Sequence, residues 1–120
     1  MGESRSPVPD SLILFERWMG TTKWMLERTA RFPTRLRHTL TNRVENKTLE
    51  ILEGVTTAAY TRNRAPVLAR VNDGLNRLRV LVRLCHELRL WSDGQYEEAA
   101  RRMDEAGRIL GGWMKGQTVG

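Results

Sequence analysis

Residues 66–91 read PVLARVNDGLNRLRVLVRLCHELRLW, and this stretch decides the fold class. Its apolar residues recur at alternating spacings of three and four, which is the period of one helix face. This seam consists of Leu68, Val71, Leu75, Leu78, Val82 and Cys85. A second apolar stripe lies beside it and consists of Leu81, Leu84, Leu88 and Trp91. A helix that is apolar on more than one face needs more than one neighbour, so the segment belongs inside a helical assembly.

Three further segments keep the same helical period. The first follows a helix-start signal at Pro9, Asp10 and Ser11, and the last follows Ser92 and Gln95, whose spacing fits a capping box. The predicted helices cover residues 10–31, 34–60, 66–91 and 94–114. Because short connections force neighbouring helices to run antiparallel, we predict an all-α, up-down-up-down four-helix bundle over residues 10–115. Residues 1–9 are expected to form a disordered leader, and residues 116–120 a tail.

Length and composition set the broad class. A chain of 120 residues with 40% hydrophobic residues is one ordinary globular domain. Its single cysteine excludes an internal disulfide and a zinc site of several cysteines. No apolar run is long enough to span a membrane, and residues 1–10 lack the apolar stretch of a signal peptide. A free thiol without an export signal favours a cytoplasmic location.

The sequence contains no catalytic constellation. Cys85 and His86 are adjacent, so on a helix they point about 100° apart and cannot form a nucleophile–base pair. None of the carboxylate clusters has the Glu-x-x-His spacing of a di-iron bundle. We therefore predict no enzyme activity, no cofactor and no metal. Gly107, Gly111 and Gly112 interrupt a helical pattern, and we attribute them to close helix packing.

The basic residues are clustered. The formal net charge is +6, and 17 of the 20 basic residues are arginine. Residues 28–47 and residues 62–83 each carry six basic residues against one acidic residue, so each cluster sums to +5. We predict that these clusters meet nucleic acid or a partner, through Arg28, Arg31, Arg35, Arg37, Arg43, Lys47, Arg62, Arg64, Arg70, Arg77, Arg79 and Arg83. GC-rich coding is the alternative explanation for the choice of arginine over lysine.

Several of these cations stand where they reduce helix stability. Arg35 and Arg37 fall in the first turn of the helix predicted at 34–60, and Arg64 lies just before the next helix. Cations near a helix N-terminus are disfavoured by about 0.3–1 kcal/mol each. This placement favours a polyanion-binding role over a merely solvated face. The two clusters fall toward opposite ends of the helix at 34–60, so a band across several subunits is expected.

The second stripe of residues 66–91 is a candidate subunit interface, formed by Leu81, Leu84, Leu88 and Trp91. The alternative is that two neighbouring helices of the same chain cover this stripe. Both arrangements satisfy a helix that is apolar on two faces.

The second half of the chain resembles a known family. Three segments carry the likeness: LNRLRVLVRL at 75–84, SDGQY at 92–96 and DEAGRILGGW at 104–113. They resemble the accessory variability determinant (Avd) family of diversity-generating retroelements. This family belongs to a wider four-helix-bundle group that includes proteins encoded in intervening sequences of ribosomal RNA genes.

The resemblance implies more than the residues do by themselves. Members of the Avd family are basic bundles that form barrel-shaped homopentamers and associate with the retroelement reverse transcriptase and its template RNA or cDNA. The resemblance therefore implies an accessory protein of mutagenic reverse transcription. The alternative function is a protein-interaction scaffold of the wider bundle group with no nucleic-acid role.

Overall fold

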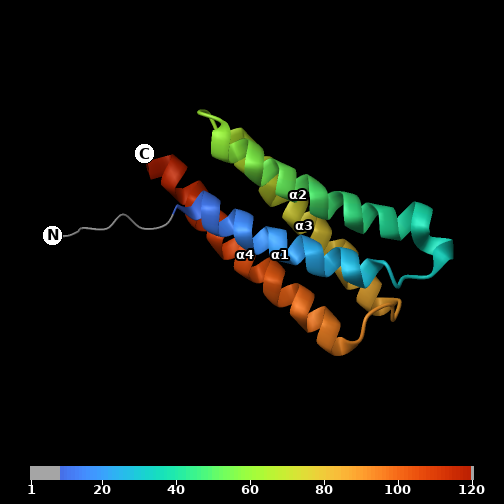
Figure 1. The fold of residues 1–120 in the computed structure, drawn as a ribbon. Coiled ribbons are helices and arrows are strands. Elements are labelled where there is room, and N and C mark those ends of the chain that lie inside the picture. The colour runs from blue at the N-terminus through green and yellow to red at the C-terminus, as the bar shows by residue number, and fades with distance from the viewer. Residues whose placement is uncertain (1–8, 120) are drawn as a thin grey trace.

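The computed structural model describes residues 9–119, and this part of the chain is helical with no strand. Its long helices are α1 (Asp10–Thr29), α2 (Asn42–Tyr60), α3 (Ala65–Glu87) and α4 (Asp93–Val119). Each helix packs against the next one along the chain, and α4 packs against α1, which closes a four-helix bundle (Figure 1). The predicted fold class is confirmed. Assembly into a ring or barrel, which the family resemblance implies, remains a prediction. The leader predicted at residues 1–9 falls, apart from Pro9, outside the described residues.

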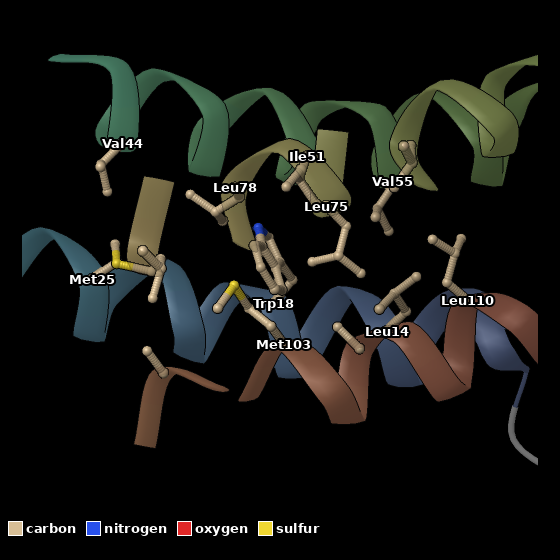
Figure 2. Packing of buried hydrophobic residues seen from close by; sticks show 14 of the residues in the cluster. Leu14, Trp18, Met25, Val44, Ile51, Val55, Leu75, Leu78, Met103 and Leu110 are labelled. Carbon is tan, nitrogen blue, oxygen red and sulfur yellow. The ribbon is translucent and has the colours of Figure 1, made fainter. Parts of the chain in front are cut away.

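The core runs along the bundle axis, and Trp18 lies at its centre (Figure 2). Trp18 is fully buried, and its Nε1 donates a hydrogen bond to the Thr48 carbonyl of α2 at 2.9 Å. The bond satisfies the one polar atom that this large side chain brings into the core. The seam predicted on α3 is buried, with Leu78, Val82 and Cys85 all at 0% exposure. Each fully buried aliphatic side chain contributes about 1.5–3 kcal/mol to stability.

Local signals start two of the helices as predicted. The capping box is present: the Gln95 amide donates to Ser92 Oγ at 3.1 Å, and the Ser92 amide donates to Gln95 Oε1 at 3.0 Å. Pro66 occupies the first turn of α3, where its missing N–H costs nothing. The helix-start signal at Pro9, Asp10 and Ser11 is followed by α1 at Asp10; the N-cap is Pro9, and no side chain makes a capping hydrogen bond there.

The connection between α1 and α2 differs from the prediction. α1 ends at Thr29, two residues earlier than predicted; the Arg31 and Phe32 amides then form tighter turns by donating to Arg28 and Thr29, and the chain becomes extended at Pro33, with φ −56° and ψ 140°. The segment predicted as the start of the second helix is a 3₁₀ turn at Thr34–Leu36, followed by a π-helical turn at Arg37–Thr41. The wider π turn holds an extra residue, and Leu40 and Thr41 both become buried.

The last two helices also end elsewhere than predicted. α3 ends at Glu87 rather than at residue 91, because Arg89 adopts a left-handed backbone conformation with φ 62°. α4 begins at Asp93 and continues to Val119, so residues 116–119, expected as tail, are helical. Glycine weakens a helix but does not end it as proline does, and residues 94–119 contain no proline.

Candidate nucleic-acid interface

The first basic cluster contains free and engaged cations. Four of its arginines are exposed, and none of them has an ion-pair partner within the described part of the chain: Arg31, Arg35, Arg37 and Arg43. The other two members are half-buried and engaged. Arg28 lies 3.6 Å from Glu27 and places its guanidinium over the Trp24 ring, and Lys47 lies 2.9 Å from Glu50. The arginines of this cluster that have no ion-pair partner therefore lie on the α1–α2 connection and in the first turn of α2.

The second basic cluster is spread along α3. Arg62 and Arg64 lie on the α2–α3 connection, and Arg70 lies in the second turn of α3. This connection is at the end of the bundle opposite to the α1–α2 connection (Figure 1). Arg64 stacks its guanidinium over the Trp113 ring at 5.8 Å and donates from Nε to the Thr61 carbonyl at 3.1 Å. Arg64 thereby ties the start of α3 to the end of α4. Arg62 and Arg70 are exposed, and within residues 9–119 neither has an ion-pair partner.

The remaining arginines of α3 are engaged with carboxylates. Arg77 pairs with Asp73 at 2.7 Å, and Arg83 pairs with Glu87 at 2.8 Å. In both cases the hydrogen bond to the carboxylate, followed by its charge, raises the pKa of the guanidinium above its ordinary value. An arginine that is already paired with a carboxylate must break or share that ion pair before it can bind a phosphate group.

Arg79 links two helices. Its Nη1 contacts Asp104 of α4 at 2.6 Å, and its Nη2 donates to the Met103 carbonyl at 3.2 Å. A Cβ on Gly107 would lie 2.8 Å from the same Nη2, so the glycine makes room for the guanidinium. The prediction of close packing is confirmed at Gly107, while a Cβ on Gly111 would meet nothing within 4 Å and one on Gly112 only Asp10 at 3.9 Å.

The cysteine and its neighbouring histidine have separate environments. Burial raises the pKa of the Cys85 thiol to about 12, so the thiol stays neutral at physiological pH and is a core group. His86 stacks on Tyr96 with ring centroids 4.2 Å apart and contacts Asp93 at 2.8 Å. The sequence pattern did not predict this cluster, because its members lie on two helices and only the packing of α3 against α4 brings them together. Within the described residues, no group of histidine, cysteine and carboxylates could hold a metal ion.

An exposed apolar row follows α3. It consists of Val80, Leu84 and Leu88, exposed by 68%, 43% and 51%. Of the four residues predicted as a subunit interface, Leu84 and Leu88 belong to this row, and Leu81 is half-buried at its edge. The expectation for Trp91 is wrong: it is 5% exposed and packs on Trp24 and Phe32 of its own chain. Val80 was not among the predicted interface residues, although it lies four residues before Leu84 and therefore on the same helix face.

A comparison with known protein families shows which family the chain belongs to. The family described as bAvd-like matches residues 12–117. The chain belongs to the bAvd-like family. The match covers all four helices, whereas the resemblance in the sequence was carried by segments from residue 75 onward. No curated protein matches the chain significantly. No helix within the described residues has the length and apolar character that crossing a membrane requires.

Proposed function

We propose that the chain is a basic accessory protein of a diversity-generating retroelement, which binds the reverse transcriptase and its template RNA or cDNA. The observation that carries the proposal is the bAvd-like match over residues 12–117. The unpaired arginines support it, because Arg31, Arg35, Arg37 and Arg43 offer guanidinium groups that no carboxylate of the described residues occupies. The proposal assigns no catalytic step, cofactor or metal to the chain and includes a cytoplasmic location.

Self-association is part of the proposal. Val80, Leu84 and Leu88 leave an apolar row on α3 that the chain itself does not cover. A second copy that covers this row would remove its leucine side chains from water, which favours association. Five copies, as in the pentamer that the family resemblance implies, would carry a formal charge of +30, since each copy carries +6. Such an assembly would attract a polyanion strongly, and added salt would weaken the attraction.

A charge-reversal variant tests the nucleic-acid role. We choose Arg35, Arg37, Arg62 and Arg70 for substitution by glutamate, because all four are exposed and no ion pair within residues 9–119 is broken. The wild-type protein is expected to bind a labelled RNA, more weakly as salt increases, and the variant is expected to lose this binding while its oligomeric state stays unchanged. RNA binding by the variant equal to that of the wild type, or no RNA binding by the wild type at low salt, would contradict the nucleic-acid role.

Two further measurements test the partners. The chain is expected to co-purify with the reverse transcriptase encoded beside it. A failure to co-purify would contradict the proposed reverse transcriptase partnership. Light scattering is expected to give a multiple of 13.9 kDa, and the monomer mass at micromolar concentration would contradict self-association.

The second candidate function is a scaffold that binds only proteins. The exposed row of Val80, Leu84 and Leu88 favours it, since such a surface suits a protein partner. Substituting Leu84 and Leu88 by serine discriminates between the two functions. The scaffold function would be supported if this serine variant loses its protein partner and the wild-type protein does not bind RNA.

A further inference from the structure

One end of the bundle gathers four arginines from two connections that are distant in the sequence. The α1–α2 connection carries Arg31, Arg35 and Arg37, and the α3–α4 connection carries Arg89. Both connections lie at the same end of the bundle, opposite to the α2–α3 turn and the C-terminus (Figure 1). We call these four residues the end arginines. All four are exposed, and none has an ion-pair partner within residues 9–119.

The carboxylates near this end are already engaged. Glu27 lies 3.6 Å from Arg28, and Glu87 lies 2.8 Å from Arg83. Asp93 contacts His86 at 2.8 Å, and Glu45 accepts a hydrogen bond from Thr29 at 2.6 Å. None of these carboxylates forms an ion pair with an end arginine, so within residues 9–119 the end arginines have no direct counter-charge. Such a surface attracts an anion more strongly than the paired arginines of α3 can.

Arg89 occupies a backbone position that suits glycine. Its φ is 62°, and it is the one non-glycine residue with positive φ among the described residues. The Arg89 amide donates to the His86 carbonyl at 2.9 Å, and the Leu90 amide donates to the Cys85 carbonyl at 3.0 Å. These two bonds form a Schellman motif, in which this position is usually glycine because a Cβ is strained there. The chain places an arginine where stability favours a residue without a side chain.

Arg35 and Arg37 also occupy positions where a positive charge lowers the stability of the helix. Arg35 lies in the 3₁₀ turn Thr34–Leu36, and Arg37 opens the π-helical turn that leads into α2. No acidic residue lies in the first turn of either of these short helical segments to offset the positive charge. Cations are disfavoured where helix N–H groups are unsatisfied, so three of the four end arginines are held at unfavourable positions.

We propose that the end arginines form a binding surface for the phosphate groups of a polynucleotide. The inference rests on the proposed function and goes further, because it separates the unpaired arginines at one end of the bundle from Arg77, Arg79 and Arg83 of α3, which have carboxylate partners. Arg89, which the sequence analysis did not include, belongs to this surface. Arg77 and Arg83 pair with carboxylates of α3 itself, and Arg79 links α3 to Asp104 of α4. Guanidinium groups suit phosphate because their planar donors bind two oxygens at once.

The test compares two variants that lose the same charge. The first replaces the four end arginines by glutamine. The matched control replaces four exposed arginines that already have carboxylate partners: Arg17, Arg77, Arg83 and Arg101. Binding of a fluorescein-labelled 20-nucleotide RNA, and of the same sequence as single-stranded DNA, is measured between about 50 and 200 mM salt.

The expected difference follows from counterion release. Each phosphate contact on a single strand contributes about 0.7 to the slope of log affinity against log salt concentration. Loss of four contacts lowers the slope by about 2.8, so the affinity ratio between 50 and 200 mM salt shrinks about 50-fold. The control variant is expected to keep nearly the wild-type slope. RNA and DNA are both expected to respond, because phosphate is common to them.

Further outcomes decide the inference. A quadruple Arg→Lys variant at the end positions is expected to keep most of the salt slope, and the glutamine variant is expected to unfold at a temperature no lower than the wild type. Equal losses of slope in the glutamine variant and its matched control would overturn the inference while leaving the proposed function standing. No binding of either strand by the wild type would overturn the proposed function itself. Poly-glutamate binding in that case would assign the surface to an acidic protein.

Discussion

Replacing Arg89 by glycine is expected to stabilise the protein, although it removes an entire side chain. A left-handed conformation costs a residue with a Cβ about 1–2 kcal/mol, and Arg89 has φ 62°. Glycine avoids this strain but loses about 0.5–1 kcal/mol through the greater freedom of its unfolded chain. The net gain in the free energy of unfolding is therefore about 0.5–1 kcal/mol.

Urea unfolding followed by tryptophan fluorescence measures this gain. Trp18, Trp24, Trp91 and Trp113 all lie in the bundle and report on its packing. With a denaturant slope of about 1.5 kcal/mol per molar, the midpoint should rise by about 0.3–0.7 M urea. In a thermal melt the same gain corresponds to about 2–4 °C for a domain of this size.

An Arg89→Ala variant is the matched control for this prediction. Alanine removes the same charge and the same long side chain, but it keeps the Cβ that is strained at positive φ. It should therefore gain little or nothing over the wild type. If the glycine and alanine variants unfold at the same urea concentration, backbone strain at this position is not the source of the effect and the reasoning fails.

Three further predictions concern α4. Gly107→Ala should leave the free energy of unfolding within about 0.5 kcal/mol of the wild type in urea melts, because the gain of about 0.5–1 kcal/mol from alanine in a helix offsets the displacement of Arg79 Nη2, which would lie 2.8 Å from the Cβ, and of its exposed pair with Asp104; a loss above about 1 kcal/mol would mean that the guanidinium is held in place. Gly111→Ala should instead raise it by about 0.5–1 kcal/mol, since a Cβ there meets nothing within 4 Å, and a decrease would indicate a covered face. The hydrogen bond from Arg101, followed by a weaker one from Arg102, lowers the pKa of Glu98, so its contribution is present above the unfolded pKa of about 4.3 and is lost as pH falls through the folded pKa. Glu98→Gln should therefore flatten the fall of stability below about pH 4.3, and an unchanged acid limb would refute this.

Local interactions made much of the fold predictable. The helical period of the α3 seam predicted the burial of Leu78, Val82 and Cys85. The capping box of Ser92 and Gln95 is a contact between residues three apart, so sequence spacing suffices to find it. The end of α3 could not be found in this way, because the usual glycine signal is replaced by Arg89.

The candidate site was likewise predictable only in part, because ion pairs within one helix follow from sequence spacing and ion pairs between helices do not. The sequence located every arginine and predicted two clusters, but it could not say which guanidinium groups are free. Arg77 and Arg83 have partners four residues away, which helical spacing could have suggested. Arg79 has its partner 25 residues away on α4, and only the packing of α3 against α4 brings the two together.

By itself, then, the sequence determined the helices, their inward faces and the excess of positive charge, because these depend on contacts within a few residues and on composition. The tertiary structure decided where that charge remains free. It brought Arg89 to the same end as Arg31, Arg35 and Arg37, and it left Val80, Leu84 and Leu88 uncovered. The physical reason is that exposure and ion pairing depend on which helices are neighbours, and residues distant in the sequence become neighbours only when the bundle closes.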